Sequence, residues 1–351
     1  MQNCTAVGER SSALAWQVTL GMTILVVVWF NIVGLRVSVH VTPDMMAYVP
    51  GYIFLTVYCR LIWRKIETAR MLIAVGQLAI VIIMGLMLSY AASTVTLPYR
   101  DAQLLALDRW LGFEREAYMA YLKRHTALRE VLYFAYMTIV HQTLLVCIVP
   151  LLVRRVDRLQ AYIIAFGLAV TATAVIASFI PAANALIYVD QAPTNLSTLP
   201  DGGHSYFPTL EGLRAGTLRT IDFGGMEGLI AFPSFHTANA ILFVWALWPI
   251  RLLRFPLLVL NFLLIASTPL AGAHYLVDLI GGAVVAFAAI FATSRLVRAP
   301  LAYVTDAPAL AEQETIRAPL LPAMRETKQG LAVKAEAYPN ASSPRAPQLL
   351  T

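Results

Sequence analysis

Apolar residues occur along this chain in long runs that short polar segments separate. A hydrocarbon core about 30 Å thick requires roughly 20 apolar residues per helix, and eight runs reach or nearly reach that length. They lie near residues 14–35, 46–63, 71–95, 131–152, 160–180, 230–250, 255–272 and 275–297. The pattern therefore predicts an all-α, polytopic membrane protein with about eight transmembrane helices.

The composition agrees with this pattern. Of the 351 residues, 59% are hydrophobic and 13% are charged, and the mean hydropathy is +0.68. Soluble domains carry about 25% charged residues, so this chain is too apolar to be one. No small-residue cleavage pattern follows the first apolar run, which is therefore expected to be a retained span. Cys4, Cys59 and Cys147 are too widely spaced to predict a disulfide framework or a metal site.

Basic residues gather in alternate connections between the predicted spans. They are Arg60, Arg64, Lys65, Arg70, Arg154, Arg155, Arg158, Arg251, Arg254, Arg295 and Arg298. Because short loops rich in lysine and arginine remain in the cytoplasm, both termini are expected there, with the longer loops outside. These loops also account for the formal charge of +6, so no nucleic-acid partner is predicted.

The runs divide the chain into three regions. Residues 1–70 are expected to form an N-terminal two-span extension, residues 71–298 a six-helix core, and residues 299–351 a proline-rich segment typical of a disordered cytoplasmic tail. In the loop 96–130, leucines recur at helical spacing among charges, which predicts a helix along the membrane interface. The loop 181–229 is glycine-rich and is expected to be irregular and to face a ligand.

Two histidines stand at the beginnings of apolar runs. His236 lies in FPSFHTANA, and His274 lies in GAHYLVDLIGG with Asp278 one helical turn later. The segment between the histidines is long enough to cross a bilayer twice, so both are expected on the same face, which is the outer one. An ionisable residue at membrane depth costs roughly 2.5 to 3.5 kcal/mol or more, which makes these residues functional candidates.

The spacing of these residues suggests a catalytic arrangement. His274 and Asp278 stand at i and i+4, so the carboxylate can accept from one ring nitrogen and leave the other as a nucleophile. That pair is the orienting half of a catalytic triad. His236 can then protonate the leaving oxygen as a general acid.

Phosphate binding is expected at the same place. Two helix N-termini would point at one site, and each would present unpaired N–H groups and the positive end of a helix dipole. The hydroxyl of Ser234 can add a donor. Arg214 and Arg219 are the nearest cations in sequence and are the predicted phosphate ligands.

The motifs PSFH and GAHYLVD resemble the second and third motifs of the type 2 phosphatidic acid phosphatase superfamily, over roughly residues 71–297, with DAQLLALDRWLGF as a weaker subgroup signature. The resemblance implies that His274 is the nucleophile, Asp278 its orienting acid and His236 the general acid, without a metal or cofactor. It also implies a phospholipid or polyprenyl phosphate substrate in the cell membrane, and a lipid alcohol as a possible acceptor.

Two positions depart from the phosphatase pattern. Phe235 stands where the family has glycine, and Thr268 stands where it has arginine. The lysine-and-arginine first motif is not visible upstream of Ser234. These features resemble those of the inositol phosphorylceramide synthase branch, whose members transfer a phosphorylated headgroup between lipids. The resemblance therefore favours a phosphotransferase.

Three alternatives remain open. A lipid phosphate phosphatase would use the same residues to hydrolyse phosphatidic acid or a polyprenyl phosphate. A zinc enzyme could take His204, His236 and His274 as ligands, although no HExxH or cysteine pair supports it. A non-catalytic transporter would also carry polar residues within its spans, but it would not require two histidines at helix starts on one face.

Overall fold

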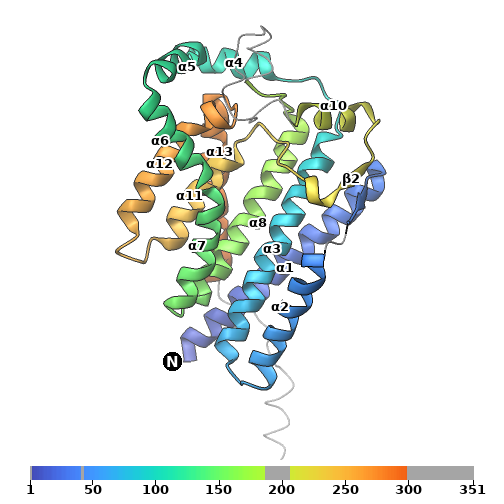
Figure 1. The fold of residues 1–351 in the computed structure, drawn as a ribbon, viewed down its shortest axis with the longest axis vertical. Coiled ribbons are helices and arrows are strands. Elements are labelled where there is room, and N and C mark those ends of the chain that lie inside the picture. The colour runs from blue at the N-terminus through green and yellow to red at the C-terminus, as the bar shows by residue number, and fades with distance from the viewer. Residues whose placement is uncertain (1, 41–42, 186–205, 299–351) are drawn as a thin grey trace, which may run out of the picture. The chain divides into compact units, whose positions relative to one another are not determined.

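The structure, a computed structural model, describes residues 2–40, 43–185 and 206–298 (Figure 1). The expected tail 299–351 and His204 lie outside the described residues. The helices are α1 (Gln2–Val33), α2 (Pro43–Leu61), α3 (Ile66–Ser93), α4 (Asp101–Trp110), α5 (Arg115–Arg124), α6 (Thr126–Met137), α7 (Ile139–Leu152), α8 (Val156–Phe179), α10 (Phe207–Ala215), α11 (Phe235–Leu247), α12 (Arg254–Ala271) and α13 (Leu276–Arg298), with a 3₁₀ turn η1 (Phe223–Gly225). The described part is mostly helical with almost no sheet, which confirms the all-α class.

Within the described residues, five helices are long and apolar enough to cross a membrane, and six if the bent pair α6–α7 counts as one span. The chain is therefore a multi-pass membrane protein. The expected span 131–152 corresponds to α6 and α7, which meet at an angle of 46°. The expected span 230–250 contains a helix of only 13 residues, because the segment before Phe235 is not helical. At 1.5 Å per residue α11 is about 20 Å long.

The core of the bundle forms around α8. This helix packs against α1, α3, α11 and α13, and two thirds of its most apolar stretch is buried. Tyr162, Ile163 and Ile164 on α8 have no exposed surface. Because α8 is apolar on all sides, it is stable only when other helices surround it.

Two short strands connect the N-terminal helices with the segment before α11. Strand β1 (Arg36–Ser38) pairs in parallel with β2 (Thr220–Asp222), with Val37 opposite Ile221. The helices α4 and α5 lie across one end of the bundle (Figure 1). Helix α4 packs against α13 at the same end as the N-terminus of α13, which carries the GAHYLVD motif. This packing brings residues of the 96–130 loop to the predicted site.

Candidate active site

His274 and Asp278 form a buried pair, although not on one helix as predicted: His274 lies in the loop two residues before α13, and Asp278 lies in the first turn of α13. The Nδ1 atom of His274 lies 3.2 Å from Oδ2 of Asp278, and the two side chains are 3% and 0% exposed. The same carboxylate oxygen accepts a hydrogen bond of 2.9 Å from the backbone N–H of Tyr275. When Nδ1 donates its proton to the carboxylate, Nε2 keeps its lone pair and can act as a nucleophile.

His236, on the first turn of α11, faces this pair. Its ring centroid lies 5.9 Å from that of His274. The His236 ring also stacks on Tyr136 of α6, with centroids 4.9 Å apart, and its Nε2 lies 3.0 Å from the Tyr136 hydroxyl. The structure therefore brings together the three residues for which a catalytic role is predicted, and it adds Tyr136, which holds the second ring in place.

The PSFH segment is fixed directly to α13. The backbone N–H of Ser234 donates to the carbonyl oxygen of Asp278 over 3.0 Å. One turn further along α13, a Cβ atom on Gly282 would lie 2.2 Å from the carbonyl oxygen of Ser234, closer than real Cβ atoms approach. A Cβ on Gly281 would lie 3.1 Å from Phe232. The two glycines therefore allow the close approach that sets His236 beside His274.

Ser234 itself has a structural function. It is fully buried and is the N-cap of α11, where its side-chain oxygen accepts from the backbone N–H of Thr237 over 3.3 Å. The Thr237 hydroxyl donates to the same oxygen. A serine N-cap typically stabilises a helix by about 1 kcal/mol. A role for Ser234 in phosphate binding stays a prediction.

The N-terminus of α13 is capped by a residue from α4. The carboxylate of Asp108 accepts from the backbone N–H groups of Leu276 and Val277, over 2.8 and 2.9 Å. Burial raises the pKa of Asp108, and these two amide donors oppose the rise. The expectation that both helix N-termini are open to a phosphate is therefore wrong for α13, because a carboxylate already occupies its first amides.

A second aspartate of α4 holds the adjoining segment. Asp101 is fully buried and accepts from the Tyr275 hydroxyl and from the backbone N–H groups of Ala183 and Asn184, at 2.9 to 3.1 Å. Asp101 and Asp108 are seven residues apart, two turns along one helix face. The sequence analysis did not predict Asp101 and Asp108 as site residues. The spacing of these two acids, seven residues apart among leucines, was a signal in the sequence that could have indicated them.

The loop before His274 has a constrained backbone. Ala273 has a φ of 54°, a left-handed conformation that costs a non-glycine residue of order 1 kcal/mol or more. Its carbonyl oxygen accepts from the backbone N–H of Ala185 over 2.9 Å. The N–H groups of Gly272 and His274 both donate to the carbonyl oxygen of Thr268. These bonds hold the loop in the shape that places His274.

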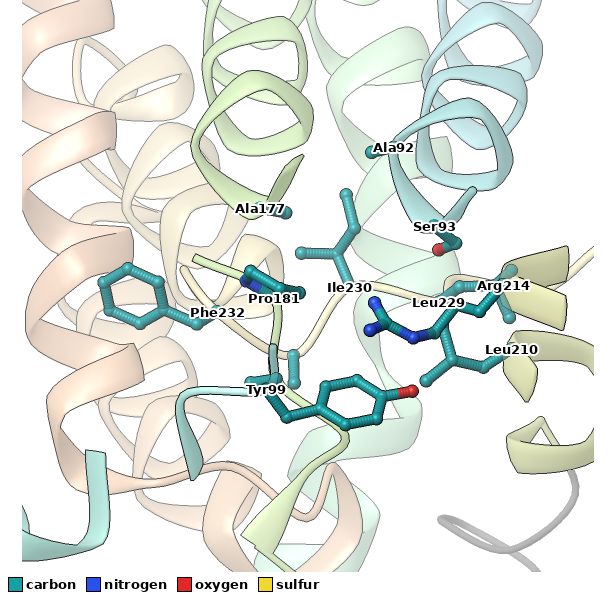
Figure 2. A pocket seen from close by; sticks show the side chains of 12 residues that line it. Ala92, Ser93, Tyr99, Ala177, Pro181, Leu210, Arg214, Leu229, Ile230 and Phe232 are labelled. Atoms are coloured by element: carbon teal, nitrogen blue, oxygen red, sulfur yellow. The ribbon is translucent and has the colours of Figure 1, made fainter. Parts of the chain in front are cut away.

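Arg214 bonds to the backbone that follows α3. Its guanidinium donates to the backbone carbonyls of Val95 and Leu97 and lies over the ring of Tyr99, 4.0 Å from its centroid (Figure 2). The cavity beside it has a volume of about 20 Å³, which is space for about one water molecule. Arg219 is exposed and follows the turn at Gly216. A phosphate-binding role for these two arginines stays a prediction.

Arg115 is a buried cation that the sequence reasoning missed. It is the first residue of α5 and is 4% exposed, and its Nη1 donates to the carbonyl oxygen of Pro269 near the C-terminus of α12. Burial lowers the pKa of His274 to about 4; a backbone hydrogen bond with Ala231 opposes this fall, and the charge of Arg115 adds a smaller contribution to it. The His274 imidazole is thus neutral at pH 7, as a nucleophile must be.

No group of three His, Cys, Asp or Glu side chains in the described part of the chain could hold a metal ion. The zinc alternative includes His204, which the structure does not describe. A family model for the PAP2 superfamily matches residues 102–292, which include both histidines and Asp278. No curated protein and no solved structure matches the chain.

Proposed function

The chain belongs to the PAP2 superfamily, and from this membership and the site we propose a membrane phosphotransferase that moves a phosphorylated headgroup from a donor lipid to a lipid alcohol. Superfamily members act on lipid phosphate esters as phosphatases or phosphotransferases. The observation that carries the proposal is the buried pair of His274 and Asp278, with the ring of His236 5.9 Å from that of His274.

In the first step, Nε2 of His274 attacks the phosphorus atom of the donor. A P–N bond forms while the bond to the leaving oxygen breaks, and His236, which enters this step as the protonated imidazolium beside the anionic phosphate ester, gives its proton to that oxygen and becomes neutral. The Asp278 carboxylate stabilises the positive charge that develops on the His274 ring, since it already accepts from Nδ1. The product is a phosphohistidine that carries the headgroup.

In the second step, the acceptor hydroxyl gives its proton to His236 and attacks the same phosphorus atom. The P–N bond breaks, and His274 returns to its neutral form. The Tyr136 hydroxyl holds the His236 ring in one orientation through both proton transfers. A lipid alcohol and water are chemically equivalent acceptors at this step, so the protein selects between them by what it admits to the site.

An apolar cavity supports a lipid substrate. It has a volume of about 660 Å³ and lies along α11, α12 and α13. Its lining runs from Ala240 on α11, one turn past His236, to Trp248, the residue just after that helix, with Phe262 on α12 and Phe287 on α13. An aromatic and aliphatic lining suits the hydrocarbon chain of the donor. Eight residues of α11 correspond to about 12 Å, the length of roughly ten methylene groups.

The reaction type is tested with purified protein and radiolabelled phospholipid donors, with and without diacylglycerol or ceramide. We expect the added lipid alcohol to capture the phosphorylated headgroup faster than water does. Thr268→Arg is the matched variant and is not expected to increase transfer, because the Thr268 side chain is buried and its hydroxyl donates to Ile265 within the helix. Rapid release of phosphate from phosphatidic acid, with every lipid acceptor ignored, would establish the hydrolase instead.

We also propose that the site opens on the outer face of the cell membrane, which the basic loops between alternate spans support. Single reporter cysteines at Lys123 on α5 and at Lys65, between α2 and α3, test this orientation in a background without native cysteines. In intact cells an impermeant thiol reagent is expected to label position 123 and not position 65. The opposite pattern would place the site in the cytoplasm.

A further inference from the structure

A cavity with two arginines in its lining lies at the end of the bundle opposite α4 and α5. It has a volume of about 310 Å³ and forms between the connection from α7 to α8, which Figure 1 shows at that end, and the C-terminal end of α11. The active site adjoins the other end of α8, since Asp101 bonds to Ala183 and Asn184 just beyond that helix. The 24 residues of α8 correspond to about 36 Å, enough to cross a bilayer core. The cavity therefore lies at the opposite membrane face.

The guanidinium of Arg158 contributes to the lining of this cavity. Its Nε and Nη2 atoms donate to the carbonyl oxygens of Ala246 and Trp245, over 3.2 and 2.6 Å. Its Nη1 atom has no hydrogen-bond partner in the described part of the chain. The arginines at positions 154 and 251, in the adjoining connections, are exposed, whereas Arg158 is partly buried. An exposed loop cation is sufficient to orient a span, but a guanidinium held between helices also suits a bound anion.

The charge around the cavity is positive. Arg155 also lines it and forms a two-point ion pair with Asp157, with N to O distances of 3.0 to 3.3 Å. Arg158 forms no ion pair with a described residue. Arg154 and Arg251 add two further positive charges in the connections on either side. An anion is therefore the ligand that this end of the bundle attracts.

Apolar surface borders the cavity. Val153 in its lining is exposed, and so are Leu151 and Leu152 before it. Arg158 and Pro249 also line the apolar cavity of about 660 Å³, so the two cavities adjoin. A soluble anion would gain nothing from these surfaces, whereas a phospholipid places its chains on them and its phosphate at the guanidinium. Basic pockets between transmembrane helices are typical binding places for anionic headgroups.

We propose that this cavity binds the headgroup of an anionic phospholipid from the leaflet opposite the active site, and that Arg158 holds its phosphate. Nη1 donates to a phosphate oxygen while Nε and Nη2 keep the carbonyls at the end of α11. The exposed Val153, Leu151 and Leu152 contact the acyl chains. This lipid is not the substrate, because the reacting histidines lie at the other membrane face. It ties the ends of α7, α8 and α11 to an anionic membrane surface.

The test is the dissociation constant of the first bound phosphatidylglycerol, measured by native mass spectrometry on the full-length protein. Phosphatidylcholine with the same chains is the neutral comparison. Wild type is expected to bind phosphatidylglycerol about 10-fold more tightly, Arg158→Gln to lose this preference, and Arg158→Lys to keep most of it. Arg60→Gln removes an exposed arginine at the end of α2 and is the matched control, which is expected to keep the preference.

Val153→Glu is a second variant, for the case that loss of the bonds to Trp245 and Ala246 unfolds Arg158→Gln. It places a negative charge at an exposed position of the lining and is expected to weaken phosphatidylglycerol binding by about 10-fold. Equal affinities of wild type for the two lipids would overturn the inference. An unchanged preference in folded Arg158→Gln, or in Val153→Glu if the former does not fold, would do the same.

Glycerophosphoglycerol, the headgroup without its chains, separates a lipid site from a site for soluble anions. It is expected to compete with phosphatidylglycerol only at concentrations far above those of the lipid. Competition at equal concentration would overturn the assignment to a lipid. None of these measurements requires turnover, so their outcome does not depend on the proposed function.

Discussion

His274→Ala is expected to abolish the phosphoenzyme and to lower the rate of headgroup transfer by about 10⁴-fold or more, because it removes the nitrogen that forms the P–N bond in the proposed mechanism. The measurement is the acid-labile label that remains on the protein after a rapid quench with a radiolabelled donor. The His274 side chain is 3% exposed, so the variant leaves a small cavity, and its thermal stability should be recorded alongside.

The matched control is His141→Ala, which removes an exposed histidine on α7. His141→Ala is expected to form the phosphoenzyme and to transfer the headgroup at the wild-type rate. If an acid-labile phosphate forms on another residue while His274→Ala remains active, His274 is not the nucleophile.

His236→Ala is expected to lower transfer from a natural donor by about 10² to 10⁴-fold, because the leaving alkoxide then departs without a proton. With a nitrophenyl ester donor, whose leaving group needs no protonation, the phosphoenzyme is expected to form at close to the wild-type rate. The measurement compares the first-turnover rates of the two donors by rapid quench.

Tyr136→Phe is the companion variant to His236→Ala. It removes the hydroxyl that lies 3.0 Å from Nε2 of His236 and retains the stacked ring. It is expected to lose less activity than His236→Ala, since the imidazole remains and only its orientation is relaxed. An equal loss for both donors in His236→Ala would show that the residue binds substrate instead of transferring a proton.

Local sequence patterns were sufficient for much of the fold. Apolar runs of about 20 residues predict helices in a membrane because the bilayer sets their length. The pattern was less reliable within the run 230–250, of which α11 occupies 13 residues. There the segment that contains Ser234 bonds to Asp278 in place of continuing the helix, and hydropathy does not report such a bond.

The sequence by itself indicated the pairing of His274 with Asp278, but its reason, a shared helix face, was wrong. His274 lies in the loop before α13, which begins at Leu276, and Asp278 in the first turn of that helix accepts from the His274 ring. The sequence also placed His236 on the same side of the membrane, since two crossings return the chain to the face it left. Only the tertiary structure decided what surrounds them. Asp108 bonds to residues 168 and 169 positions away, and Arg115 to one 154 positions away. Such contacts depend on how α4 and α5 fold across the bundle, and no local spacing encodes that arrangement.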